Sequence, residues 1–195
     1  MTLRLVLITH APTPATHAAS FAADESLTAA GQSSAETVRS GPRRVRSAWR
    51  GPEARCAETA EALGLDARID SALTDLNVGG WRGLDPARIQ ADDPAGLAVW
   101  LTDPEVAPHG GETIGGLLTR VSVWLAALPR VPGRVAAVTH PAVVRAAVLC
   151  VLGAPARSFW NLDVKPLSET RMSWSGEKWR LQEVGRPLIE PFSST

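Results

Sequence analysis

Two histidines each follow a run of apolar residues that predicts a buried strand. His10 comes after the run at residues 3–8 and precedes a Pro/Thr segment that ends the strand, and His140 comes after the run at residues 134–139. The carboxyl ends of strands in an open α/β sheet are where such folds bind ligands, so the sequence predicts one shared site. Imidazole titrates near neutral pH, and such a pair can therefore supply a nucleophile and a hydrogen-bond donor.

Further polar and small residues occur in a fixed order along the chain. The fragments are Leu7-Ile8-Thr9-His10-Ala11-Pro12-Thr13, Leu27-Thr28 with Gly31, Arg55 with Thr59-Ala60, Leu73 with Asp75, Gly79 with Trp81 and Gly83, Gly110-Gly111-Glu112-Thr113, and Val138-Thr139-His140 with Arg145. Their order and spacing resemble the histidine phosphatase superfamily, in the branch that holds the cofactor-dependent phosphoglycerate mutases and small phosphatases. The resemblance covers roughly residues 3 to 150.

This resemblance implies roles for three residues. His10 takes the place of the nucleophile that becomes transiently phosphorylated, and neutral imidazole can attack phosphorus at pH 7 without first losing a proton. His140 takes the place of the histidine that binds the transferring phosphoryl group. Arg55 matches the arginine of an R-x-x-x-T-A helix, where a guanidinium fork suits the paired oxygens of a phosphate. The structural alternatives are two core histidines and a solvated arginine.

The general acid has two candidates. The family usually places a glutamate in an L-x-E segment, whereas this chain has Leu73-Thr74-Asp75, with a side chain one methylene shorter. A nearby phosphate favours the protonated form of Asp75, as a general acid near neutral pH requires. A turn-forming aspartate is the alternative for Asp75. Glu112 is the second candidate acid, and it could instead cap its helix or orient other groups.

The chain departs from the family pattern beside the nucleophile. Thr9 and Ala11 replace the arginine and glycine of the R-H-G signature, and Thr16 stands where many members carry a substrate-contacting asparagine. Gly51 replaces the usual serine before Arg55, and Arg82 stands where glutamate is common. The missing arginine is ordinarily a phosphate clamp, and loss of one transition-state donor typically costs ~10²–10³ in rate.

Three functions fit this pattern. The first is a phosphatase on a small phosphorylated metabolite, in which Arg82, Arg145 or another arginine replaces the lost charge. The second is a degenerate member that binds a phosphorylated or other anionic metabolite without turning it over, and the third is an altered catalyst on a non-phosphate substrate. The joint presence of His10, Arg55 and His140 favours the first. The expected substrate-binding residues are Thr9, Ala11, Thr13, Thr16, Arg82, Glu112 and Arg145.

Strands that alternate with helices predict the fold. We expect a three-layer α/β/α sandwich with a mainly parallel central sheet, formed by one domain over residues 1–195. Helices are expected near residues 28–40, 52–63, 113–128 and 141–152, and a late hairpin near residues 169–183. The segment at residues 77–111 is rich in loops, with room for short helices.

Composition excludes several classes of function. Lys plus Arg and Asp plus Glu each number 20, so the balanced charge argues against nucleic-acid and membrane partners. Neither the histidines nor the two cysteines have a metal-binding spacing, and we expect no metal and no cofactor. The chain shows no signal-peptide pattern, which predicts a cytoplasmic protein. A homodimer is left open, because late tryptophans fit either strand packing or an oligomer contact.

Overall fold

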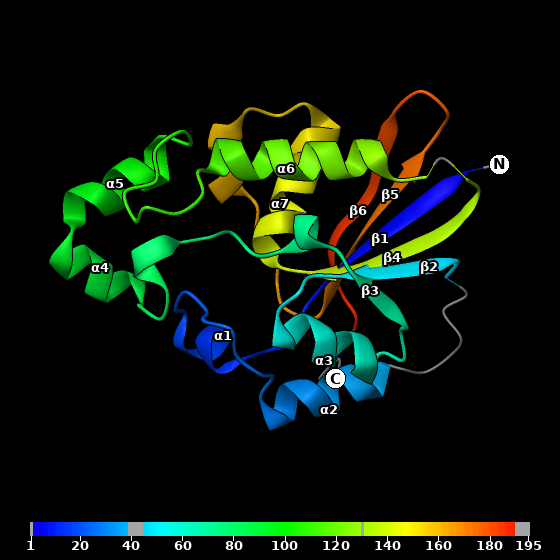
Figure 1. Cartoon of the computed structure of the whole chain (residues 1–195), viewed down its shortest axis with the longest axis horizontal. Coiled ribbons are helices and arrows are strands. Elements are labelled where there is room, and N and C mark those ends of the chain that lie inside the picture. Colours follow the sequence, from blue (N-terminus) through cyan, green and yellow to red (C-terminus); the bar gives the residue numbers. More distant parts are fainter. Residues whose placement is uncertain (1, 39–44, 130, 190–195) are drawn as a thin grey trace, which may run out of the picture.

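The computed structural model describes residues 2–38, 45–129 and 131–189, in which strands and helices alternate (Figure 1). The strands are β1 (Leu3–Thr9), β2 (Ser47–Arg50), β3 (Ala67–Ile69), β4 (Gly133–Thr139), β5 (Ser168–Trp174) and β6 (Trp179–Pro187). The helices are α1 (Pro14–Ala18), α2 (Ala29–Val38), α3 (Ala54–Ala62), α4 (Pro86–Asp92), α5 (Pro94–Thr102), α6 (Ile114–Ala127) and α7 (Pro141–Leu152). Short 3₁₀ helices cover Ser71–Leu73, Gly79–Trp81 and Ala156–Asn161.

One mixed sheet holds the strands in the order β3-β2-β4-β1-β5-β6. The first four strands of that order pair in parallel, whereas β5 pairs antiparallel with both β1 and β6. The mainly parallel sheet is therefore confirmed. The pairing of β1 with β4 runs in register until Thr9 lies opposite Thr139, so His10 and His140 leave the sheet side by side.

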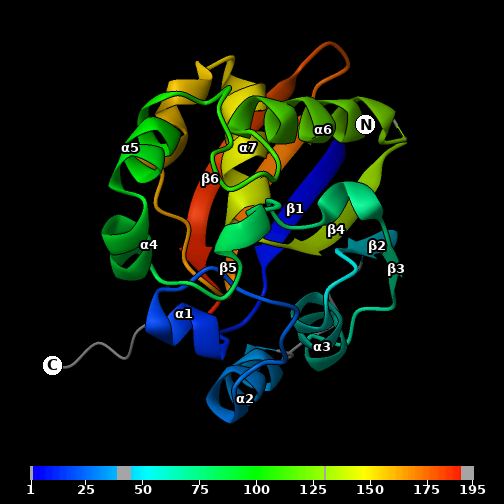
Figure 2. The same ribbon diagram turned by 60° about the vertical axis from the view of Figure 1, so that its left-hand side comes forward.

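Helices cover both faces of the sheet, as the predicted three-layer fold requires. Figures 1 and 2 show α6 and α7 on one face and α2 and α3 on the other, with α4 and α5 beyond one end of the sheet. The side chains of β1 alternate between the two layers. Leu5 and Leu7 pack in the cluster that includes α6 and α7, whereas Val6 and Ile8 pack with Cys56 and Ala60 of α3.

Local signals in the sequence set several boundaries. Thr28 Oγ accepts a hydrogen bond from the backbone N–H of Gly31 at 3.0 Å, as expected before a helix. Pro141 lies in the first turn of α7, and Gly153, with φ of 63°, ends that helix in the left-handed conformation. The helix expected near residues 28–40 is α2, and residues 39 and 40 lie outside the described part of the chain.

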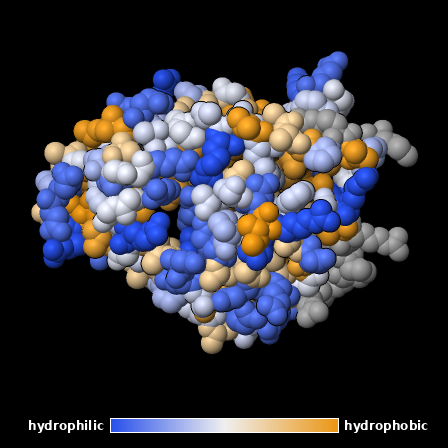
Figure 3. Space-filling model, viewed as in Figure 1, coloured by the Kyte–Doolittle hydropathy of each residue, from blue (hydrophilic) through white to orange (hydrophobic). Residues whose placement is uncertain are grey.

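Hydrophobic and hydrophilic residues are mixed on the surface that Figure 3 presents. In Figure 3, hydrophobic residues form small separate patches among hydrophilic ones on the face that this view presents. Within the described ranges, the helices are all too short or too polar to cross a bilayer.

Candidate active site

His10 lies just beyond β1 and has one ring nitrogen already engaged. Its backbone N–H donates to the carbonyl of Thr139 at 2.9 Å, and its Nδ1 lies 2.9 Å from the carbonyl oxygen of Ala11. A carbonyl only accepts, so Nδ1 carries the proton and Nε2 keeps its lone pair. Burial, aided by the charge of His140, lowers the pKa of His10 to about 4. The imidazole is therefore neutral at pH 7, with a free lone pair on Nε2.

His140 is a buried cation between two carboxylates. Its ring centroid lies 5.3 Å from that of His10. Its Nε2 lies 2.8 Å from Glu53 Oε2, and its Nδ1 lies 3.3 Å from Asp75 Oδ2. Although burial opposes the charge, Asp75 together with Cys56 and Glu53 raises the pKa of His140 to about 10. His140 is thus an imidazolium at neutral pH.

Arg55 and Asp75 form a second charged pair beside the histidines. Arg55, from the first turn of α3, is 2% exposed, and its Nη2 donates to Asp75 Oδ2 at 2.8 Å. Its Nη1 donates to the carbonyl of Ala23, while its buried Nε has no partner among the described residues. Burial raises the pKa of Asp75, but the positive charges of His140 and Arg55 outweigh this effect and lower the pKa below its usual value. Asp75 is therefore a carboxylate in the free site.

Glu112 lies behind this site and holds the segment that carries Asp75. Its carboxylate accepts from Nε and Nη2 of Arg120 at 2.9 and 2.7 Å. Arg120 Nη1 donates in turn to the carbonyls of Ala72 and Thr74 at 2.9 and 3.0 Å. Glu112 lines neither cavity described below, and its two predicted roles, general acid and orienting residue, both stay predictions.

Thr9 and Ala11 are buried and do not line the cavity in front of His10, and their expected role in binding substrate stays a prediction. Thr9 Oγ is buried, donates to the carbonyl of Lys165 at 2.7 Å and accepts from the backbone N–H of Ser168 at 2.9 Å. Ala11 packs in a small apolar cluster with Leu167, and its N–H donates to Thr59 Oγ at 3.0 Å. The φ angle of Ala11 is not positive, so an alanine in place of the family's glycine causes no backbone strain at this position.

A reintroduced arginine at position 9 should therefore not restore a phosphate clamp. Thr9→Arg would put a long charged side chain into the closed space against Lys165 and Ser168, and we expect it to lower the free energy of unfolding by about 3 kcal/mol. Urea titration would measure this, with Thr119→Arg on the exposed face of α6 as the matched control. A Thr9→Arg protein that keeps its stability and gains activity would contradict the expectation.

A cavity of about 500 Å³ opens in front of His10. Of the predicted site residues, His10, Thr13, Thr16, Asp75 and Arg145 line it. Arg145 Nε donates to the carbonyl of Leu162 at 2.7 Å. Arg82 is exposed and lines an adjoining cavity of about 370 Å³ that Arg55 and Asp75 also border. The two candidate replacement arginines thus lie on different sides of Asp75.

Aromatic side chains form one wall of the cavity in front of His10, and this wall was not predicted from the sequence. The wall consists of Phe21, Trp100, Phe159 and Trp160. The guanidinium of Arg145 lies 5.6 Å and 5.8 Å from the ring centres of Phe159 and Trp160. These residues come from a loop, α5 and the 3₁₀ helix at residues 156–161. No local pattern joins them, so the sequence offered no signal for the wall.

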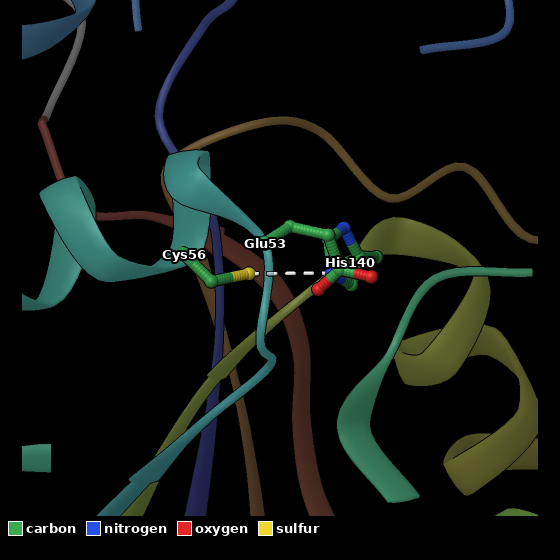
Figure 4. Close-up of side chains that lie close together, drawn as sticks. All are labelled: Glu53, Cys56 and His140. Atoms are coloured by element: carbon green, nitrogen blue, oxygen red, sulfur yellow. Dashed lines mark hydrogen bonds and ion pairs between the residues drawn. The ribbon is translucent and has the colours of Figure 1, made fainter. Parts of the chain in front are cut away.

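Glu53 and Cys56 were also not predicted from the sequence as residues of the site. Both occur in the first turn of the Arg55 helix or just before it, and a carboxylate two residues before Arg55 was the available signal. Figure 4 shows both side chains directed at His140, and Cys56 Sγ lies 3.3 Å from the same Nε2 that Glu53 contacts.

These three residues are also a candidate metal set, because their ligand atoms lie within 4.8 Å of one another. Nitrogen and oxygen ligands of one tetrahedral zinc are separated by about 3.3 Å. The 2.8 Å between His140 Nε2 and Glu53 Oε2 is instead the length of a charge-assisted hydrogen bond. The expectation that the protein uses no metal and no cofactor stays a prediction.

Comparisons with known proteins agree with this geometry. The chain is 43% identical over 53 residues to the glucosyl-3-phosphoglycerate phosphatase of Mycobacterium tuberculosis, over 27% of this chain and 24% of that protein. It is 30% identical to the enzyme of the same name from Mycolicibacterium vanbaalenii, over 52% of this chain and 51% of that one. The aligned regions thus span between a quarter and about half of these relatives.

Structural likeness extends over the whole sheet. A solved mycobacterial glucosyl-3-phosphoglycerate phosphatase superposes with a TM-score of 0.82 at 26% identity, over 95% of this chain and 100% of that one. Residues 5–187, which include both histidines and Arg55, match the model of branch 1 of the histidine phosphatase superfamily. By this match, and with its paired histidines just beyond the ends of adjacent parallel strands, the chain belongs to the histidine phosphatase superfamily.

Proposed function

We propose that this protein hydrolyses a phosphomonoester by way of a phosphohistidine at His10. The observation that carries the proposal is the geometry of the two histidines, whose ring centres lie 5.3 Å apart: the Ala11 carbonyl engages Nδ1 of His10 and leaves Nε2 free, whereas His140 lies between Glu53 and Asp75. The lowered pKa of His10 and the raised pKa of His140 agree with it. A neutral imidazole with a free Nε2 lone pair faces the cavity, and an imidazolium stands beside it. This is the division into nucleophile and anion stabiliser that phosphoryl transfer requires.

In the first step His10 Nε2 forms a bond to phosphorus as the bond from phosphorus to the leaving oxygen breaks. Protonated Asp75 gives its proton to that oxygen, and the incoming phosphate helps to protonate Asp75 by disfavouring its anionic form. In the second step water attacks phosphorus, Asp75 takes the proton from the water, and the bond to Nε2 breaks. His10 is thereby returned as neutral imidazole.

Donors at the site are suited to the phosphoryl oxygens. His140 Nδ1 lies 3.3 Å from the carboxylate of Asp75, which lines the cavity, and Arg55 Nε, which has no partner among the described residues, is a further buried donor. Arg145 supplies the cation that Thr9 cannot, because it lines the cavity with His10 and its guanidinium is held against aromatic rings. This supports the hypothesis of a working phosphatase over a degenerate binding member.

The substrate is a small phosphorylated metabolite. Similarity to glucosyl-3-phosphoglycerate phosphatases supports a phosphorylated sugar derivative, and the half-buried rings of Phe21 and Trp160 offer apolar surface on which a sugar or aryl group can pack. Glucosyl-3-phosphoglycerate, a simple sugar phosphate and an aryl phosphate therefore form the first substrate panel.

Trapping the intermediate tests the mechanism. Incubation with a radiolabelled phosphomonoester should leave acid-labile, base-stable label on the wild-type protein and none on His10→Ala, which should also lose turnover. His17→Ala, at an exposed position in α1, is the control and should label normally. Turnover that persists in His10→Ala would contradict the proposal.

Activity should be greatest between about pH 4 and about pH 6. Above about pH 4 His10 is neutral and nucleophilic. Because Asp75 is ionised in the free site, the proton for the leaving group must arrive with the substrate, and a phosphomonoester carries it below the second pKa of its phosphate, about 6. The profile of kcat/KM should rise through the lower value and fall through the upper one. A continued rise above neutral pH would show that the proton has another source.

A further inference from the structure

Glu53 is held rigidly between the Asp75 segment and His140. It directly precedes α3, and its side chain is 15% exposed. Its Oε1 accepts from Thr74 Oγ at 2.6 Å and from the backbone N–H of Asp75 at 2.9 Å. Its Oε2 lies 2.8 Å from His140 Nε2, and Figure 4 shows the two side chains next to each other. Both oxygens are thus engaged, and the carboxylate has little freedom to leave the imidazole.

Gly51 makes room for this arrangement. A Cβ added at position 51 would lie 2.7 Å from Glu53 Oε2, 2.9 Å from the carbonyl oxygen of Leu73 and 3.1 Å from His140 Nε2. Contacts this short require a neighbour to move, and the Leu73 carbonyl belongs to the backbone. A side chain at position 51 is therefore incompatible with the present position of the Glu53 carboxylate.

Because Glu53 is present, Asp75 is not the only carboxylate that stabilises the charge of His140, and Asp75 is free to exchange a proton. His140 contacts a carboxylate through each ring nitrogen, Glu53 through Nε2 and Asp75 through Nδ1. Under the proposed function Asp75 becomes protonated during each turnover and then no longer stabilises the imidazolium. Glu53, which accepts hydrogen bonds from Thr74 and Asp75, stays ionised. His140 can therefore keep its charge while Asp75 exchanges its proton.

We propose that Glu53 is a positioning residue that holds His140 as an imidazolium with Nδ1–H directed to the phosphoryl site, and that Gly51 admits it. This inference rests on the proposed function for its catalytic consequence, but the contact itself can be tested in the resting protein. The titratable and charged groups around His140 are Glu53, Asp75, Cys56, His10 and Arg55.

Nitrogen-15 NMR of the imidazole rings tests the contact directly. In the wild type both nitrogens of His140 should stay protonated at about pH 8. In Glu53→Gln the ring should lose a proton at a lower pH than in the wild type, whereas Glu61→Gln, the same change at an exposed site of α3, should leave the titration unchanged. An identical His140 titration in Glu53→Gln and the wild type would overturn the proposal, whether or not the protein is a phosphatase.

Kinetics test the catalytic consequence. Glu53→Gln should lower kcat by about 10–100-fold, the equivalent of one hydrogen bond to a charged group, with a smaller change in KM. Glu53→Asp, which keeps the charge on a shorter side chain, should recover part of kcat. A fall in kcat without any change in the His140 titration would indicate a purely structural role and would overturn the inference.

A double-mutant cycle tests the dependence on Gly51. Gly51→Ser alone should lower kcat, because its side chain displaces Glu53 or His140. In the Glu53→Ala background the same substitution should cost at least about 5-fold less, since the carboxylate is gone. Circular dichroism would confirm that each variant folds. Additive effects of the two substitutions would overturn the link between these residues. Absence of wild-type turnover would count against the proposed function alone, because the NMR comparison is independent of it.

Discussion

Replacing Arg55 with lysine should lower kcat/KM for an aryl phosphate by about 10²–10³-fold, although the positive charge is kept. The guanidinium of Arg55 directs Nη2 to Asp75 and Nη1 to the Ala23 carbonyl, which leaves Nε–H as a fixed buried donor. A lysine ammonium has neither the planar fork nor the same reach, so it cannot hold Asp75 and a phosphoryl oxygen together. Steady-state kinetics on both proteins would measure the loss.

The control for this substitution is Arg68→Lys, at an exposed position of β3. It should leave kcat/KM unchanged, because Arg68 lines neither cavity near His10. Inorganic phosphate should also stabilise the wild type against thermal unfolding more than Arg55→Lys, since a ligand at ~100 times its dissociation constant adds ~2.7 kcal/mol. If Arg55→Lys retains most of its activity, Arg55 is a structural partner of Asp75 and does not bind phosphate.

The parts of the site that lie at strand ends could be predicted from sequence. An apolar run that ends in a polar residue marks the carboxyl edge of a parallel sheet, so two such runs were enough to place both histidines at one site. Arg55 was assigned differently, by resemblance to the R-x-x-x-T-A helix of the family, and its burial in the first turn of α3 is a finding of the structure. The strand ends depend on local periodicity, which a single sequence records.

Contacts between segments that are distant in sequence could not be predicted. Glu53 and His140 are 87 residues apart and meet because β2 and β4 are neighbours and each is followed by a helix. The direction of Thr9 depends on its bonds to Lys165 and Ser168, more than 150 residues away. The carboxylate of Glu112 likewise meets the Asp75 segment through Arg120.

The two candidate acids can be separated by the leaving group of the substrate. An alkoxide leaving group must be protonated as it departs, whereas a nitrophenolate can leave without a proton. Asp75→Asn should therefore lower kcat/KM by about 10²–10⁴-fold for an alkyl phosphate, the usual contribution of a general acid, and much less for a nitrophenyl phosphate. Asparagine keeps the size of the side chain and can still accept from Arg55, so the pocket should remain intact.

Glu112→Gln is the matched comparison for Asp75→Asn. Glu112 holds Arg120, which binds the carbonyls of Ala72 and Thr74, so its loss should move the Asp75 segment and slow both substrates by a similar factor. A general acid changes the ratio of the two rates, whereas a positioning residue changes both rates together. If Asp75→Asn affects both substrates equally and Glu112→Gln affects only the alkyl phosphate, Glu112 is the acid and must reach the cavity through a movement of its loop. The opposite pattern follows from the geometry, because Asp75 borders the cavity with His10 and Glu112 does not.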